Sequence, residues 1–116
     1  MSSDQIPAVN VDDLPADLST ADAPLLVDVR EPDEWSAGHI DGALHIPMGE
    51  LAARLGEVPK EQDVVVVCRS GRRSAAVTTY LAQGGWQARN LTDGMVAWAA
   101  RGRPMVSEGG SAPTVL

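Results

Sequence analysis

Four consecutive valines, Val64 to Val67, are the feature that most narrows the possible folds of this chain. A continuous run of β-branched apolar residues between polar ones is typical of a strand that is buried on both faces. Such strands occur in parallel sheets that are covered by helices on both sides. The run ends at Cys68, the only cysteine, and a helix-compatible segment follows from Ser74 to Gln83. The sequence therefore predicts an α/β protein with a thiol at the carboxyl end of a central strand.

The loop between this strand and helix combines the thiol with basic residues, serine and glycine. Its members are Cys68, Arg69, Ser70, Gly71, Arg72, Arg73 and Ser74. A helix N-terminus presents backbone N–H groups and the positive end of the helix dipole. With three arginines added, we expect the pKa of Cys68 to fall from about 8.5 toward roughly 3.5–7.5. A lone cysteine is more often a small buried hydrophobe, but that kind of cysteine would continue among apolar neighbours. The loop is instead typical of an anion cradle.

Length, composition and charge limit the class of protein. A chain of 116 residues with 44% hydrophobic content predicts one globular domain, placed here at residues 1–104, with a flexible tail at 105–116. The absence of a transmembrane-length segment or a recognisable leader, together with a single cysteine, predicts a cytoplasmic protein. The net charge of −7 argues against a nucleic-acid partner. The cysteine and histidines form no zinc-binding pattern, so we expect neither a metal nor a cofactor.

Strands and helices alternate along the rest of the chain. The predicted strands cover residues 5–9, 25–29, 64–67 and 86–91, with a short one inside 38–47, and the predicted helices cover 11–18, 32–37, 47–55, 74–83 and 94–100. Alternation of this kind predicts a parallel sheet with helices on both faces. In such sheets, ligands bind at the carboxyl ends of the strands. Asp28 and Arg30 end one strand and Cys68 ends another, so we expect them to meet at one edge.

The order of several motifs resembles that of the single-domain rhodaneses, a sulfurtransferase family, over residues 6–104. Asp28-Val29-Arg30-Glu31 with Gly38-His39-Ile40 resembles the first signature, residues 68–74 resemble the active-site loop, and Gly84-Gly85-Trp86 with Gly94 and Trp98 resembles the closing signature. Asp93 departs from the family, which usually has a second glycine at that position. The resemblance implies a central five-stranded parallel sheet with helices on both faces.

The resemblance also implies a reaction. The Cys68 thiolate would take a sulfane sulfur from a donor such as thiosulfate, carry it as a persulfide, and give it to a thiophilic acceptor or a partner protein. Backbone N–H groups of residues 70–74 would stabilise the sulfur anion. Arg69 and Arg72 would hold the sulfonate end of the donor, a role that suits a planar guanidinium. Arg73 would either share that role or brace the loop.

Polar residues outside the loop have structural roles as alternatives to functional ones. The Asp28 carboxylate either holds loop N–H groups or an arginine near the pocket, or it pairs with a surface arginine. Arg30 is expected to pair with Glu34 and to fix the short helix after it. For His39 and His45 we favour turn and packing roles, because no second ligand or nucleophile is spaced with them.

Three other functions compete with sulfur transfer to small molecules. Phosphatases and arsenate reductases also place a cysteine before an anion cradle, but their spacing from cysteine to arginine is longer than the four residues between Cys68 and Arg73. A non-catalytic binding module of the same fold would be expected to lack Cys68. A relay that delivers persulfide sulfur to a partner protein would use the same residues, and this alternative stays open.

Overall fold

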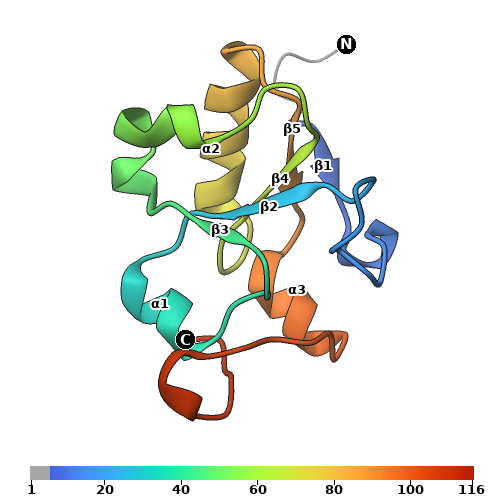
Figure 1. Cartoon of the computed structure of the whole chain (residues 1–116), viewed down its shortest axis with the longest axis vertical. Coiled ribbons are helices and arrows are strands. Elements are labelled where there is room, and N and C mark those ends of the chain that lie inside the picture. The colour runs from blue at the N-terminus through green and yellow to red at the C-terminus, as the bar shows by residue number, and fades with distance from the viewer. Residues whose placement is uncertain (1–5) are drawn as a thin grey trace.

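The computed structural model describes residues 6–116 and contains a five-stranded, fully parallel sheet (Figure 1). The strands, in the order β1-β5-β4-β2-β3 across the sheet, are β1 (Ala8–Val9), β5 (Ala88–Leu91), β4 (Val64–Val67), β2 (Leu25–Asp28) and β3 (Leu44–His45). The α-helices are α1 (Pro32–Ala37), α2 (Arg72–Gln83) and α3 (Gly94–Ala100). The predicted α/β fold with a central five-stranded parallel sheet is confirmed.

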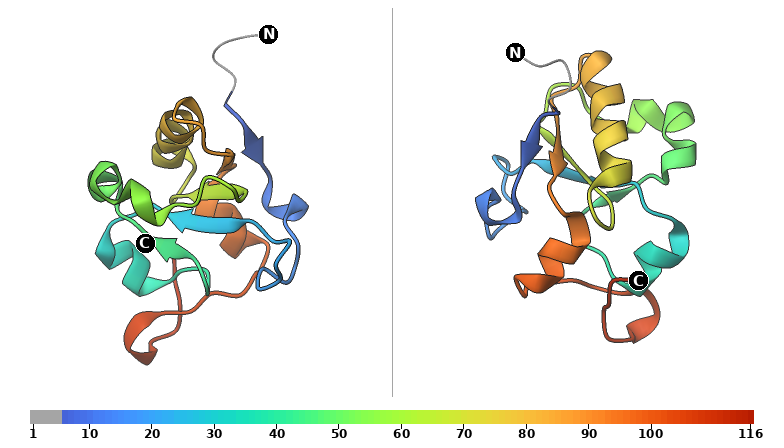
Figure 2. Two further views of the ribbon diagram at one scale, coloured as in Figure 1. Left: turned by 45° about the horizontal axis from the view of Figure 1, so that its top comes forward. Right: turned by 180° about the vertical axis from the view of Figure 1, so that it is seen from behind.

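The valine strand β4 lies in the middle of the sheet and its side chains alternate between two cores. Val64 and Val66 belong to the core under α2, whereas Val65 and Val67 belong to the core under α3. All four are fully buried, because neighbouring side chains of a strand point to opposite faces and helices cover both faces. Figure 2 shows α2 and α3 on opposite sides of the sheet. The sheet therefore presents the carboxyl end of β4 between two helix layers.

Two of the predicted helices form only 3-10 helices. The segment 11–18 forms only a single 3-10 turn, η1 (Val11–Asp13), because Pro15 favours an extended Leu14, whose φ and ψ are −85° and 143°. The segment 47–55 forms two 3-10 helices instead, η2 (Met48–Glu50) and η3 (Ala52–Glu57).

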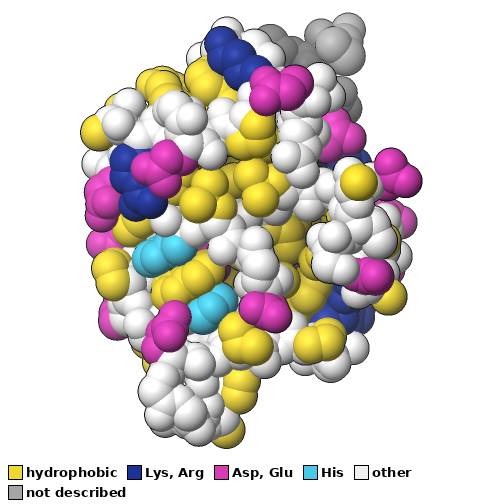
Figure 3. Space-filling model, in the orientation of Figure 1, with side chains coloured by type: hydrophobic (Ala, Val, Ile, Leu, Met, Phe, Trp, Pro, Cys, Tyr) yellow, Lys and Arg dark blue, Asp and Glu magenta, His cyan; other side chains and the backbone are white. Residues whose placement is uncertain are grey.

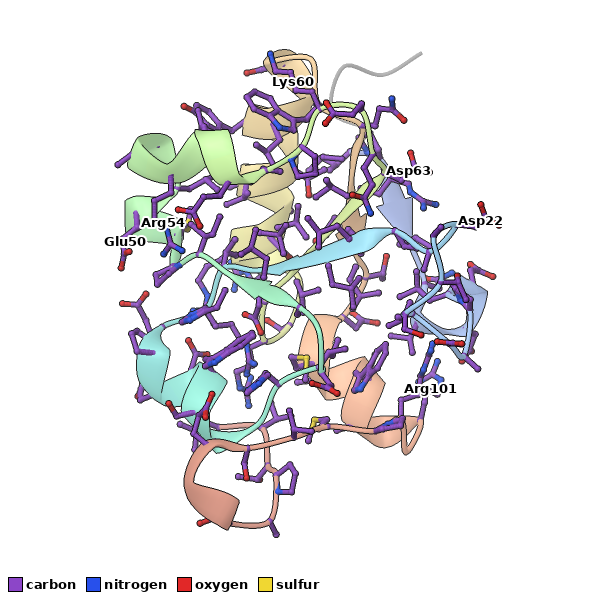
Figure 4. The ribbon with its side chains drawn as sticks, viewed as in Figure 1. Asp22, Glu50, Arg54, Lys60, Asp63 and Arg101 are labelled. Atoms are coloured by element: carbon purple, nitrogen blue, oxygen red, sulfur yellow. The ribbon has the colours of Figure 1, made fainter. Side chains whose placement is uncertain are left out.

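Arg54 is where η3 departs from helical geometry, with φ −117° and ψ 18°. Its guanidinium donates to Glu57, to Glu50 and to the carbonyl of His45, and Figure 4 shows Arg54 beside Glu50. These side-chain bonds stabilise a tight local turn rather than a continuous helix.

Other boundaries differ by a few residues. Helix α2 begins at Arg72, two positions before the predicted start at Ser74. The first predicted strand, 5–9, is represented by Ala8–Val9, and its first residue, Gln5, lies outside the described residues. No helix within residues 6–116 is long and apolar enough to cross a membrane.

Residues 105–116 lie against the domain in this structure, and Figure 1 shows the C-terminus beside α1. Val106 and His39 exchange two backbone hydrogen bonds of 2.8 Å, and the Thr114 N–H donates to the carbonyl of Ala37 at 2.9 Å. A side chain at Gly38 would overlap the backbone of Thr114. The predicted boundary at residue 104 and the flexibility after it stay predictions, and these contacts are what such flexibility would have to break.

Candidate active site

Cys68 is the first residue after β4 and its sulfur lies in the curve of the loop that leads into α2. The side chain is 1% exposed. Its Sγ accepts hydrogen bonds from the backbone N–H of Gly71 at 3.1 Å, the backbone N–H of Ser74 at 3.4 Å and the Ser74 hydroxyl at 3.2 Å. The loop is therefore a ring of donors around one sulfur atom.

These contacts decide the ionisation of the thiol. Burial raises the pKa of Cys68, but hydrogen bonds from the Ser74 hydroxyl and from the N–H groups of Ser74, Gly71 and Ser70 together lower it below its ordinary value. The N-terminus of α2 lies next to the sulfur and favours negative charge there as well. The direction agrees with the expectation from the sequence, and it makes the thiolate, the nucleophilic form, more accessible.

Glycine is required at Gly71 for the loop to close around the sulfur. Its φ is +95°, a conformation that side chains disfavour, and an added Cβ would lie 3.2 Å from the backbone nitrogen of Asp93.

The start of α3 holds the loop from the other side. The N–H of Met95 donates to the Cys68 carbonyl at 2.9 Å, and that of Val96 donates to the Arg69 carbonyl at 3.0 Å. A side chain at Gly94 would overlap the Cys68 carbonyl. Asp93, the departure from the family pattern, adopts a φ of +61°, which aspartate tolerates better than most residues. The turn is therefore kept without the second glycine.

The three loop arginines have three different environments. Arg73 donates to both carboxylate oxygens of Glu34 in α1, at 2.7 and 2.8 Å. This pairing lowers the pKa of Glu34 to about 2 and raises the pKa of Arg73. The Arg69 Nε donates to the Leu116 carbonyl at 2.6 Å. Arg72 is exposed and makes no side-chain hydrogen bond within residues 6–116. Arg73 is thus positioned as the brace between the loop and α1.

Asp28 and Arg30 form a buried pair rather than surface contacts. The Arg30 Nε lies 3.0 Å from Asp28 Oδ1, and its Nη2 donates to Asp28 Oδ2 and to the Gly38 carbonyl, both at 2.8 Å. The two side chains are 0% and 1% exposed. The expected pairing of Arg30 with Glu34 is wrong, because Arg73 occupies that carboxylate. Asp28 therefore binds a buried arginine, Arg30, rather than a surface one.

The two histidines pack against one tryptophan. The Trp35 ring stacks on His39 with centroids 3.6 Å apart and on His45 with centroids 4.6 Å apart. Figure 3 shows both histidines on one face with a hydrophobic side chain between them. Residues 6–116 contain no group of acidic, histidine and cysteine side chains that could hold a metal ion. The favoured packing role of the histidines fits this arrangement.

Two residues that contact the loop were not identified from the sequence. The Asn90 amide, on β5, donates from Nδ2 to the Gly71 carbonyl at 3.1 Å and accepts at Oδ1 from the Ser74 hydroxyl at 2.5 Å. Glu34 braces Arg73. Asparagine is uncommon in strands, so its presence inside a predicted strand was the available signal.

Comparison with known proteins agrees with this geometry. Residues 10–101 match the profile of the Rhodanese-like domain family. A protein named "Sulfurtransferase" from Allochromatium vinosum is 46% identical over 74% of this chain and 81% of its own length. A putative sulfur carrier protein of Bacillus subtilis is 31% identical over 86% of this chain and 55% of its own length.

A solved structure extends the agreement to the fold. The crystal structure of a rhodanese-related protein from Thermoplasma volcanium superposes with a TM-score of 0.79 and 31% identity, over 88% of this chain and 99% of that one. The similarity extends over most of both chains, well beyond the Cys68 loop. Together with the match over residues 10–101, this shows that the chain belongs to the rhodanese-like family of sulfurtransferases and sulfur carriers.

Proposed function

We propose that this protein transfers a sulfane sulfur from an anionic, thiosulfate-like donor to a thiophilic acceptor through a persulfide on Cys68. The Cys68 thiolate attacks the terminal sulfur of the donor, the donor's S–S bond breaks, and sulfite leaves with the bonding electron pair. An acceptor thiolate or cyanide then attacks the outer sulfur of the persulfide. The S–S bond of the persulfide breaks, and the Cys68 thiolate is regenerated.

The observation that carries the proposal is the set of three donors on one sulfur atom. Gly71 N–H, Ser74 N–H and the Ser74 hydroxyl converge on Cys68 Sγ within 3.1–3.4 Å. The two backbone N–H groups are preformed and stabilise a sulfur anion without reorganising, both in the resting thiolate and in the persulfide. A cysteine that only fills space in the core would not need these hydrogen-bond donors.

The placement of charge supports an anionic donor. Cys68 is buried at the base of the loop, whereas Arg69 and Arg72 are exposed. A donor with a reactive sulfur at one end and a charged sulfonate at the other would place its sulfur at Cys68 and its charge near these guanidinium groups. On a chain with a net charge of −7, the loop is a local positive region.

The experiment is an intact-mass measurement after incubation with thiosulfate. We expect one added sulfur atom, which cyanide removes as thiocyanate, and we expect no adduct on the Cys68→Ser variant with an unchanged circular dichroism spectrum. An adduct on the serine variant, or none on the wild-type protein, would refute the proposal. The latter result would favour a non-catalytic module.

Donor recognition is tested by removing one exposed charge. Arg72→Ala is expected to raise the KM for thiosulfate roughly three- to tenfold, because a charged contact of about 1 kcal/mol is lost. Arg101→Ala is the matched control. Arg101 directly follows the last residue of α3 and pairs with Asp12 at 3.2 Å (Figure 4). Equal KM values for the two variants would assign donor binding to the backbone alone.

A sulfur carrier that serves a partner protein is the second candidate. The 31% identical sulfur carrier protein of Bacillus subtilis favours it. Both candidates predict the same adduct on Cys68, so the acceptor separates them. A carrier would release its sulfur faster to a protein thiol than to cyanide, which competition between the two acceptors measures.

A further inference from the structure

The Ser74 hydroxyl lies between two groups that both accept hydrogen bonds. Its Oγ is 3.2 Å from Cys68 Sγ and 2.5 Å from Asn90 Oδ1. A hydroxyl has one proton and therefore donates to one acceptor at a time. The other contact is satisfied only if that partner supplies a proton of its own, and only Cys68, as a thiol, is able to do so.

The contact with Gly71 decides which atom of the Asn90 amide faces Ser74. The carbonyl of Gly71 only accepts, so the amide nitrogen must be the atom that faces it, at 3.1 Å. The amide oxygen is then the atom toward Ser74, and it only accepts. Asn90 lies in register with Val66 of β4, so the sheet itself fixes the amide beside the loop.

Two hydrogen-bond arrangements follow from this geometry. In the thiol state, the Ser74 hydroxyl donates to Asn90 Oδ1 and accepts the S–H proton of Cys68. In the thiolate state, the S–H proton is gone, and the hydroxyl turns to donate to sulfur with the N–H groups of Gly71 and Ser74. The amide oxygen competes with the sulfur anion for a single proton.

We propose that Asn90 is a positioning residue that acts on Cys68 through Ser74: it takes the hydroxyl hydrogen bond while the sulfur is protonated and gives it up when the sulfur becomes an anion. For the thiol and thiolate this depends only on the contacts above. Its extension to the persulfide anion rests on the proposed function. The effect is that the Ser74 hydroxyl is hydrogen-bonded in both protonation states of the sulfur, while Asn90 Oδ1 accepts its proton only when the sulfur is a thiol.

Charged groups near the sulfur would not explain a change in the ionisation of Cys68 when Asn90 is substituted. The charged side chains on the loop, on α1 and β5, at the end of β2 and at the start of α3 are Arg69, Arg72, Arg73, Asp33, Glu34, Arg89, Asp28, Arg30 and Asp93. A neutral substitution at Asn90 alters none of them, so its influence on the sulfur must pass through hydrogen bonds.

The test is a double-mutant cycle on the ionisation of Cys68. Because Cys68 is the only cysteine, the rate of alkylation by iodoacetamide as a function of pH reports its pKa directly. Asn90→Ala is measured in the wild-type, Ser74→Ala and Ser74→Thr backgrounds. Below the pKa, we expect Asn90→Ala to raise the thiolate fraction at least threefold more with Ser74 present than with alanine there, because the hydroxyl is then always free for sulfur.

The Ser74→Thr background keeps a hydroxyl and is expected to restore the response to Asn90→Ala. An equal response in the serine and alanine backgrounds would overturn the proposal, because Asn90 would then act only by holding the Gly71 carbonyl. Alkylation reads the thiol whether or not sulfur is transferred. A failure of this cycle is therefore distinct from a failure to form the thiosulfate adduct.

Discussion

Two segments of this molecule contact each other and are held in very different ways. The loop 68–74 is fixed by its own donors, by the start of α3 and by Asn90, and its sulfur is buried. The segment 105–116 is held by backbone hydrogen bonds to His39 and Ala37 and by Met105 and Val115, which pack against the core under α3, and most of its residues are exposed. The Arg69–Leu116 contact joins the two.

The comparison teaches which kind of contact shapes a site. The loop depends on residue types that cannot be exchanged freely, such as a glycine at φ +95° and a hydroxyl beside sulfur. The segment 105–116 depends on backbone groups, which any residue offers, on the packing of Met105 and Val115, and on a missing side chain at Gly38. The loop should therefore be sensitive to single substitutions, while the C-terminal segment should be tolerant.

The largest expected contrast is between two glycine-to-alanine substitutions. Gly71→Ala forces a side chain into a left-handed conformation at a cost of about 1–2 kcal/mol. It also moves a donor away from Cys68, so we expect formation of the thiosulfate adduct to slow by roughly tenfold or more. Gly38→Ala is the matched variant, since its added Cβ overlaps the backbone of Thr114 and displaces only the C-terminal segment.

Rates of adduct formation by mass spectrometry, together with thermal melting, measure both variants. Gly38→Ala should keep nearly the wild-type rate. A loss of adduct formation in Gly38→Ala as large as that in Gly71→Ala would show that the loop is not self-supporting, and the comparison would fail.

The same contrast explains what could be predicted from the sequence. The β4 strand and the thiol at its end follow from a run of valines and its sudden end, a local pattern. The docking of residues 105–116 does not follow from the sequence. Its hydrogen-bond partners are the Ala37 carbonyl and the His39 backbone, and every residue type carries these backbone groups.

Charge pairing fails for a related reason. The sequence predicts that Glu34 pairs with Arg30, which lies four positions before it. The structure pairs Glu34 with Arg73, 39 positions away, while Arg30 is buried with Asp28. Only the packing of α1 against the loop decides between them, so the identity of the brace depends on tertiary structure.

A smaller effect is expected from the brace between the loop and α1. Glu34→Gln removes the charge that Arg73 binds but keeps an oxygen that accepts from the Glu31 N–H, as Glu34 does at 2.9 Å. We expect a loss of stability of about 1 kcal/mol near neutral pH. Because the folded pKa of Glu34 is about 2, below the 4.5 of the free side chain, this stabilisation is fully present above about pH 4.5 and is lost as pH falls through about 2.

Urea unfolding from pH 7 to pH 2 measures this dependence. The stability difference between the wild-type protein and Glu34→Gln should be constant down to about pH 4.5 and should then shrink. Glu50→Gln is the control, because Glu50 pairs with Arg54 at the surface, where its side chain is 56% exposed. A difference that stayed constant to pH 2 would mean that Glu34 acts by packing rather than by charge.

The smallest effect is expected at the C-terminal segment itself. Thr114→Pro removes the N–H that donates to the Ala37 carbonyl at 2.9 Å, while Thr114→Val keeps it. One hydrogen bond contributes about 0.5–1.5 kcal/mol, and here it stabilises local docking rather than the global fold. The Val106 amide, which bonds to the His39 carbonyl at 2.8 Å, should then exchange up to about tenfold faster in the proline variant.

Three readouts separate local from global effects in this last case. The amide of Val66 in the central strand should exchange at the wild-type rate, the melting temperature should be unchanged, and adduct formation should change by less than about twofold. That outcome follows because the donors to Cys68 Sγ come from residues 70, 71 and 74, not from residues 105–116. A tenfold change in adduct formation would instead make the Arg69–Leu116 contact part of the reaction, since it is the hydrogen bond that links this segment to the loop.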